Sequence, residues 1–359
     1  STMNQTTKAD IKILFGQRLE RARRMRGMSL RALAGSIGNI VSYNALHKYE
    51  QGEMLPDSTV LRALAKALGQ TTDLFFRPFT VSLNAIAFRK KSGLGARAKA
   101  SLREEAAEYF ERYLEVEQAL GLDVTFTNPL SDVVIRSGDD IEAAAVKLRT
   151  HWTLGLESIG NVVELLEQRQ VKVFMLDADM AFDGFSGWSD GIPVIVLNHK
   201  HTTERLRLTA IHELAHIIFK FDESIPHKAI EKLCHRFAGA MLIPKATFER
   251  EFGGYRRTIS VKELTDIKED FGVSIAAIMA RAHDLQLISD SGYKQFCILY
   301  NKWNWRAKEP GQYLGSEAST RFEQLLQRAV AKEALSITLA ASLAKKPLHE
   351  FERDIKLVP

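Results

Sequence analysis

Cysteine is scarce in this chain, whose 359 residues include two, Cys234 and Cys297. Two cysteines cannot form the disulfide framework that stabilises small secreted domains. The sequence also has no run of 18 apolar residues, which argues against a membrane-spanning helix. The first residues show no apolar core of the kind found in signal peptides. From these absences we expect a reduced, cytoplasmic protein with no membrane partner.

Acidic residues are scarce in the first hundred positions, which hold 17 Lys and Arg but 6 Asp and Glu. The remaining positions hold 32 Lys and Arg and 38 Asp and Glu, so they carry a mild negative charge. A basic segment ahead of an acidic body favours a polyanionic partner such as nucleic acid for that segment. The alternative is an uneven surface charge with no partner.

Short helices separated by tight breaks are predicted over residues 13–76. Ser29 and Ser42 stand where the N-caps of two such helices are expected, and serine is a preferred N-cap residue. Glycine favours the end of a helix, so we expect helices to stop near Gly27, Gly52 and Gly69. Apolar spacing predicts a helix-turn-helix in which Leu30, Leu33, Ala34 and Ile37 pack against Leu46, Tyr49 and Leu61.

The second helix of this pair would turn a polar side outward. A helix in that position can enter the major groove of DNA and present polar groups to base edges. The alternative is a small helical domain with a solvated polar face. The candidate DNA-binding residues are Arg31, Ser42, Tyr43, Asn44, His47 and Lys48. The arginines expected to hold phosphates are Arg18, Arg23, Arg24 and Arg31.

The stretch "MSLRALAGSIG…NALHKYEQGEMLPDSTVLRALAKALG" resembles the Xre/Cro-type helix-turn-helix of bacterial and phage regulators. Its most specific part is "YEQG" followed by a proline. Between Gly38 and Glu50 the chain is slightly longer than is usual in that family. The resemblance implies that a double-stranded DNA operator is one partner of the protein.

Residues 79–100 are basic and contain glycine, as a linker does. From Ser101 the spacing of apolar residues predicts a long connecting helix, which we expect to pack on the following domain. Residues 291–359 are predicted to form a helical tail. Its apolar and basic faces suit docking or formation of a homodimer.

The segment "AIHELAHIIF", residues 210–219, places two histidines and a glutamate in an apolar helical run. His212 and His216 are four residues apart, so both imidazoles lie on one helix face and can bind one metal ion. Glu213 follows the first of them and can reach a metal-bound water, which is the H-E-x-x-H arrangement of zinc peptidases. The alternative is a pair of core histidines with structural hydrogen bonds.

A catalytic zinc site needs a third protein ligand, and a second predicted helix, "KAIEKLCHRFAGAMLIP", offers two. Glu231 and His235 lie four residues apart on one face of it. Negative charge favours Glu231 as the ligand, with His235 as a supporting group or a competing ligand. Strands are predicted over residues 170–177 and 192–198, with a loop over 177–191 between them. A strand beside the site could bind an extended peptide.

The stretch "DGFSGWSDGIPVIVLNHKHTTERLRLTAIHELAHIIF…EKLCHRFAGAMLIP" resembles the ImmA/IrrE family of metallopeptidases. The resemblance implies a zinc cofactor, His212 and His216 as ligands, Glu213 as general base and Glu231 as the third ligand. Cys234 and His235 depart from the family pattern, which has alanine and then asparagine or aspartate there. Nothing ranks the candidates for stabilising the oxyanion, which are Tyr255, His283 and Tyr293.

We therefore expect an α+β, mostly α protein with a zincin-like peptidase domain that contains a small sheet. The predicted segments are a helix-turn-helix domain (10–78), a linker and connecting helix (79–120), a peptidase domain (121–290) and a helical C-terminal region (291–359). The predicted function is that of a zinc metalloendopeptidase that regulates transcription by cleaving a repressor, a toxin partner or a similar protein. The alternative is a DNA-binding regulator, repressor-like or antitoxin-like, whose peptidase fold senses or binds a partner without turnover.

Overall fold

The computed structural model describes residues 8–78 and 94–356, and the chain forms two compact units. The first unit contains the residues up to 86, then 93–124 and 320–359, and the second contains 125–319 with a short segment from the linker. Most of the predicted linker lies outside the described residues. Within the described ranges, no helix combines the length and the apolar character needed to cross a membrane.

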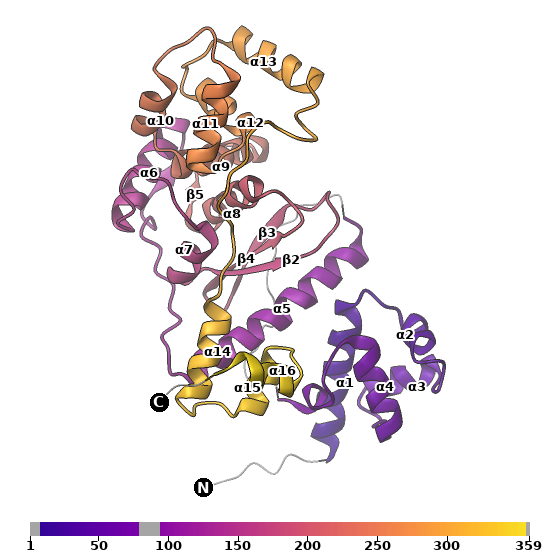
Figure 1. Cartoon of the computed structure of the whole chain (residues 1–359). Coiled ribbons are helices and arrows are strands. Elements are labelled where there is room, and N and C mark those ends of the chain that lie inside the picture. The colour runs from indigo at the N-terminus through magenta and orange to yellow at the C-terminus, as the bar shows by residue number, and fades with distance from the viewer. Residues whose placement is uncertain (1–7, 79–93, 357–359) are drawn as a thin grey trace. The chain divides into compact units, whose positions relative to one another are not determined.

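The first unit begins with the predicted helix-turn-helix (Figure 1). Ser29 and Ser42 are N-caps, as predicted, and each hydroxyl accepts a hydrogen bond from a backbone N–H in the first turn of its helix. Gly16 allows a close approach, because a Cβ there would stand 2.5 Å from the carbonyl oxygens of Tyr49 and Glu50. The elements are α1 (Lys8–Met25), α2 (Leu30–Ser36), α3 (Tyr43–Glu50), α4 (Ser58–Leu68) and the 3₁₀ helix η1 (Thr72–Phe76).

The predicted core of this domain is confirmed. Leu33, Ala34, Ile37, Leu46 and Tyr49 are buried in one cluster, with Leu30 and Leu61 packed against it. A left-handed glycine follows each of the helices that were expected to end at one, at Gly27, Gly52 and Gly69.

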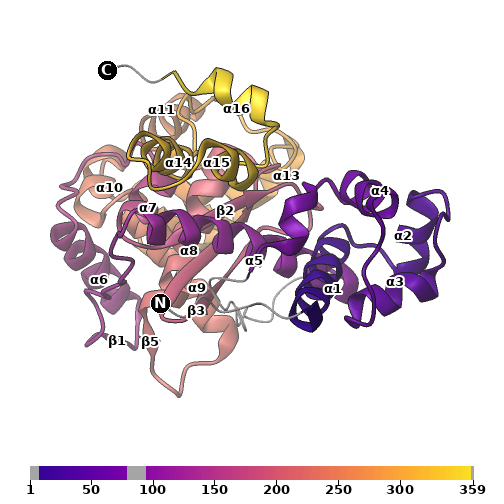
Figure 2. The ribbon, with the colours of Figure 1, turned by 90° about the horizontal axis from the view of Figure 1, so that it is seen from below.

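The connecting helix α5 (Ala96–Ala119) starts five residues before the predicted Ser101. It was expected to pack on the following domain, but in the first unit it packs against α1 and α14 (Figure 2). The apolar face of the tail is therefore used inside the chain, where Phe322, Leu325 and Leu326 bury against Tyr113 and its neighbours. The tail helices are α14 (Arg321–Ala331), α15 (Ile337–Leu343) and α16 (Leu348–Asp354).

The second unit contains a three-stranded sheet with the order β2-β4-β3. β2 (Lys172–Leu176) and β4 (Ile192–Asn198) pair in parallel and confirm the two predicted strands. The loop predicted over 177–191 is wrong in its second half, because Gly184–Ser189 form β3, antiparallel to β4. Two glycines and two serines give that strand a turn-like composition, and pairing with the apolar β4 overrides it. β1 (Val134–Ile135) and β5 (Lys220–Phe221) form a separate parallel pair.

Helices make up the rest of this unit, so the chain is mostly α with a small sheet, as predicted. α8 packs on β3 and β4 and also against α9, which explains why its sequence is apolar on most sides. The helices are α6 (Gly138–His151), α7 (Val162–Gln168), α8 (Thr203–Ile218), α9 (His227–Leu242), α10 (Lys245–Phe252), α11 (Val261–Phe271), α12 (Ile275–Asp284) and α13 (Asp290–Lys302).

The two compact units group the four predicted segments differently. The connecting helix falls in the first unit, and the C-terminal region is shared, with 291–319 in the second unit and 320–359 in the first. The second unit is inserted, in sequence order, between two parts of the first unit. The domain boundaries proposed from the sequence stay a prediction.

Candidate metal centre and DNA-binding surface

Two histidines of α8 face each other across one side of the helix. Thr202 caps the start of α8, and a buried apolar run follows through the H-E-x-x-H segment. The Nε2 atoms of His212 and His216 are 3.3 Å apart, and both side chains are almost fully buried. Burial of two imidazoles with their nitrogens facing each other is unfavourable unless a positive ion lies between them or a proton is shared.

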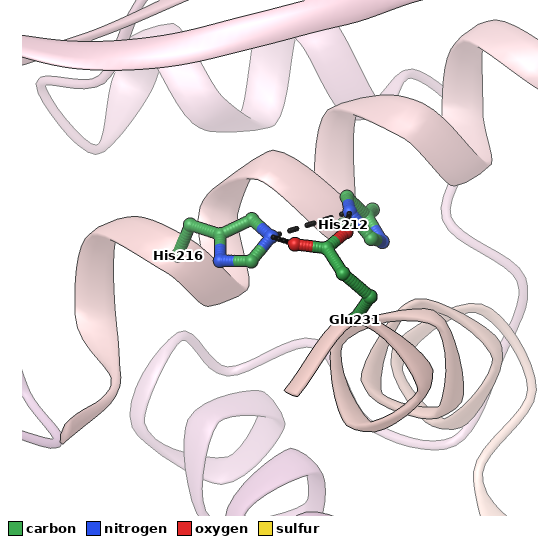
Figure 3. Close-up of side chains that lie close together, drawn as sticks. All are labelled: His212, His216 and Glu231. Carbon is green, nitrogen blue, oxygen red and sulfur yellow. Dashed lines mark hydrogen bonds and ion pairs between the residues drawn. The ribbon is translucent and has the colours of Figure 1, made fainter. Parts of the chain in front are cut away.

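Glu231 of α9 completes a triangle with these nitrogens (Figure 3). Its Oε2 lies 3.2 Å from Nε2 of His212, and its Oε1 lies 3.3 Å from Nε2 of His216. Two ligands held about 2.0–2.1 Å from a tetrahedral zinc ion are about 3.3–3.4 Å apart. The separation of the two imidazole nitrogens fits two corners of such a tetrahedron, and the Glu231 carboxylate has one oxygen near each nitrogen. One ligand atom from each of the three residues lies within 4.8 Å of the others, so these residues form a cluster that could hold a metal ion.

The outward nitrogens of the two histidines have different surroundings. Nδ1 of His216 lies 3.5 Å from Sγ of buried Cys234. Nδ1 of His212 is buried and has no hydrogen-bond partner among the described residues. The exposed His235 places its ring 4.2 Å from the ring of His212, centroid to centroid and tilted by 44°. The structure thus brings His235 beside one candidate ligand, in ring contact with it.

Glu213 points from α8 toward the sheet. Its side chain is buried, and its Oε2 accepts a 2.7 Å hydrogen bond from the hydroxyl of Ser186 in β3. Sequence reasoning missed Ser186 because it assigned this residue to a loop. A hydroxyl on one face of a buried strand beside the helix that carries the candidate ligands is the signal that could have found it.

The three candidates for stabilising an oxyanion are not brought to the triad by any contact within the described residues. Tyr255 is 60% exposed. The ring of His283 stacks on Tyr293 at 4.5 Å and its Nε2 lies 2.7 Å from Asp290. His227, four residues before Glu231, lies closer, with its Nε2 3.8 Å from Oε1 of Glu231. Its side chain is mostly exposed.

The outer side of α3 is exposed, as predicted. Tyr43, Asn44, His47 and Lys48 are all solvent-exposed, while Leu46 and Tyr49 are buried on the opposite side. The guanidinium of Arg31 lies 4.9 Å from the centre of the Tyr43 ring, which links α2 to the start of α3. Ser42 is committed to capping α3 through its side chain.

Three of the four predicted phosphate-binding arginines make ion pairs within the first unit. Arg18 is buried and lies 2.7 Å from Glu111, so it is not available to DNA. Burial lowers the pKa of Arg18, although the charge of Glu111 opposes this effect. Arg23 is bound to Glu50, and hydrogen bonding to that carboxylate raises the pKa of Arg23. Arg24 is half-exposed and pairs with Glu20 one turn away.

Two family models match the chain, one within each compact unit. Residues 166–283 match the model of a peptidase family described as the IrrE N-terminal-like domain. Residues 14–75 match a model described as a helix-turn-helix domain. The first match contains the His212, His216 and Glu231 cluster, and the second contains α3. No curated protein matched the chain.

Proposed function

Because the chain joins a helix-turn-helix domain to an IrrE N-terminal-like domain, we propose that it is a zinc-dependent endopeptidase coupled to DNA binding. His212, His216 and Glu231 would hold one zinc ion. The observation that carries this proposal is the triangle of 3.2–3.3 Å separations between the two imidazole nitrogens and the carboxylate. The buried Glu213 beside that triangle supplies a candidate base.

Zinc bound at such a site polarises the scissile carbonyl and lowers the pKa of a bound water. Glu213 would accept the proton of the attacking water and pass it to the leaving amine. Ser186 holds Oε2 of Glu213, so Oε1 is the oxygen that we assign to proton transfer. A carboxylate fixed from one side in this way keeps one orientation toward the substrate.

A protein substrate suits the sheet beside the cluster. β3 pairs with β4 along one edge and is the end strand in the order β2-β4-β3. An extended peptide can add to such an edge through backbone hydrogen bonds. We propose that the substrate is a repressor or a similar regulatory protein, and that its cleavage changes transcription of a gene whose operator the first unit binds.

A second candidate function is a DNA-binding regulator that uses the metal cluster as a sensor without turnover. The exposed face of α3 favours it, because DNA contact through Asn44, His47 and Lys48 requires no catalysis. In this alternative, metal or partner binding to the second unit would alter operator binding. Formation of a homodimer and a cytoplasmic location are parts of both proposals.

The test compares Glu213→Gln with Glu231→Gln in the full chain, with exposed Glu223→Gln as the matched control. Wild type and Glu213→Gln should each bind about one zinc ion per chain, since Glu213 is not a ligand. Glu231→Gln should lose zinc because it removes an anionic ligand. Metal is measured by mass spectrometry after dialysis, and cleavage by mapping new protein N-termini in cells that express each variant.

Glu213→Gln should reduce cleavage by about 10²–10⁴-fold, the usual effect of losing a positioned general base. Glu223→Gln should leave both zinc and cleavage unchanged. If Glu213→Gln preserves the transcriptional response in cells while Glu231→Gln abolishes it, the sensor hypothesis is right and the peptidase hypothesis is wrong. A folded wild-type chain that takes up no zinc contradicts the peptidase and also the metal-sensing form of the alternative.

A further inference from the structure

A cavity of about 230 Å³ lies among α10, α11, α12 and α13 in the second unit. Its lining shares no residue with the candidate metal cluster. Apolar cavities of about 150 Å³ are large enough to hold benzene, so this one can take a small aromatic ring with a short substituent. It is therefore a candidate site for a small molecule.

An aromatic wall forms one side of the cavity. Trp303 and Trp305 lie with their rings 4.9 Å apart, and Phe296 belongs to the same lining. Trp303 is 46% exposed, and α13, from which this wall extends, has no buried residue. Large apolar groups left half-exposed around a cavity favour an apolar or aromatic occupant, which would cover them.

The charge on the cavity lining is positive. Arg257 is among the lining residues and, in the part of the chain that the structure describes, makes no ion pair or hydrogen bond through its side chain. The neighbouring Arg256 differs, because it is held 2.6 Å from Glu263. The described lining contains no aspartate or glutamate. An anionic group on the occupant would find a guanidinium that has no competing carboxylate.

We propose that this cavity binds a small aromatic carboxylate, with its ring against Trp303 and Trp305 and its carboxylate at Arg257. Ser289 and Gln295 add polar groups to the same lining. An aromatic ring with one charged end is the ligand class that uses both the apolar wall and the free guanidinium.

The cavity is joined to the helix that carries Glu231. Met279 lines the cavity from α12, and Arg281 of the same helix donates a 2.9 Å hydrogen bond to the carbonyl of Ile243, directly after α9. A bound ligand would thus contact a helix that is fixed to the end of α9. The binding itself requires neither zinc nor turnover, so it is testable whether or not the chain is a peptidase.

The test measures binding of 3-phenylpropionate to the full chain by isothermal titration calorimetry. We expect saturable binding with a dissociation constant of about 1 mM or lower, which is usual for so small a ligand. The neutral 3-phenylpropionamide should bind at least about tenfold more weakly, since it cannot form the charged pair. Tryptophan fluorescence gives a second readout, because two of the four tryptophans line the cavity.

Arg257→Gln should weaken 3-phenylpropionate binding about tenfold or more and leave the amide unchanged. The matched control is Arg250→Gln, an arginine of α10 that is paired with Glu251 at 3.0 Å and lies outside the lining. The proposal is overturned if no saturable binding occurs, or if Arg257→Gln has no effect. It is also overturned if N-acetylphenylalanine amide binds as well as the acid, because the cavity would then accept apolar protein side chains.

Discussion

Replacing Arg18 with alanine tests whether this residue stabilises the first unit or contacts DNA phosphates, two roles that the sequence alone does not distinguish. Basic residues of this segment are candidates for phosphate contacts, yet Arg18 is buried inside the first unit. It lies 2.7 Å from Glu111 of α5, and it donates hydrogen bonds of 2.9 and 3.0 Å to the carbonyls of Arg77 and Pro78. We therefore expect Arg18→Ala to destabilise the first unit and to leave the DNA-binding surface intact.

The expected loss of unfolding free energy depends on which buried charge stays without its partner after the change. Removing one partner of a buried ion pair costs about 3–5 kcal/mol, mainly because the other charge stays buried. Glu111 keeps Arg21 as a second partner, which places the expected loss near the lower end, at about 3 kcal/mol. The control is Arg24→Ala, because Arg24 is half-exposed and pairs with Glu20 within one helix. An exposed pair of that kind contributes about 0.3–0.5 kcal/mol.

The assay must distinguish the two units. All four tryptophans lie within residues 125–319, so their fluorescence reports unfolding of the second unit. Far-ultraviolet circular dichroism reports the unfolding of both units. The part of its change that has no counterpart in the fluorescence belongs to the first unit, and in Arg18→Ala this part should occur at a lower urea concentration. Binding to a random 30-base-pair duplex, measured without urea, should keep its dependence on salt concentration. The reasoning is refuted if Arg18→Ala leaves urea unfolding unchanged and lowers the salt slope by about one, which indicates a lost phosphate contact.

Two further predictions concern α3 and α11. Lys48→Ala should weaken duplex binding and reduce its salt dependence while zinc content stays constant, and a filter-binding series at several salt concentrations measures this; unchanged binding would mean that this face of α3 does not meet DNA. Hydrogen bonds from Arg256 and Ser260 lower the pKa of Glu263 from 4.5 to about 2. Because the folded value is the lower one, this capping interaction stabilises α11 above about pH 4.5 and is lost as pH falls toward 2. Acid unfolding should therefore depend less on pH in Glu263→Gln over that window, and identical curves for the two proteins would contradict it.

The pairing of the two histidines in the candidate metal cluster could be predicted from the sequence because it depends on local helix geometry. His212 and His216 are one helical turn apart, so their shared face follows from helix geometry alone. Charge and the family resemblance favoured Glu231 over His235, but the position of either side chain against the two histidines depends on the packing of α9 on α8, which the spacing of residues within one helix does not give. The structure places the Glu231 carboxylate against both imidazole nitrogens and leaves His235 beside the His212 ring. Ser186 escaped prediction because β3 has a weak strand signal and depends on its pairing with β4.

The role of Arg18 was beyond sequence reasoning for a related reason. Its partner Glu111 is 93 positions away, and the sequence of a helix does not show whether one of its basic residues faces solvent or another helix. The helix boundaries around it were predictable because capping is local, as the N-caps Ser29 and Ser42 show. Local chemistry thus predicts where a helix begins, and long-range packing decides which of its charges are available for binding.

The C-terminal tail belongs to the first unit through long-range contacts, which local sequence patterns do not predict. A helix-turn-helix match that stops at residue 75 suggests a domain complete in itself. Yet Arg77, just beyond that match, donates a 2.6 Å hydrogen bond to Ser342 of α15, and Arg112 of α5 donates one to the carbonyl of Leu343. Phe322 and Leu325 of α14 fill the core beside Tyr113. Residues 320–356 therefore complete a core begun before residue 120, and the chain passes between the two units at both ends of the segment 125–319. Two covalent connections therefore join the units at the ends of the segment 125–319, one before and one after the candidate metal centre.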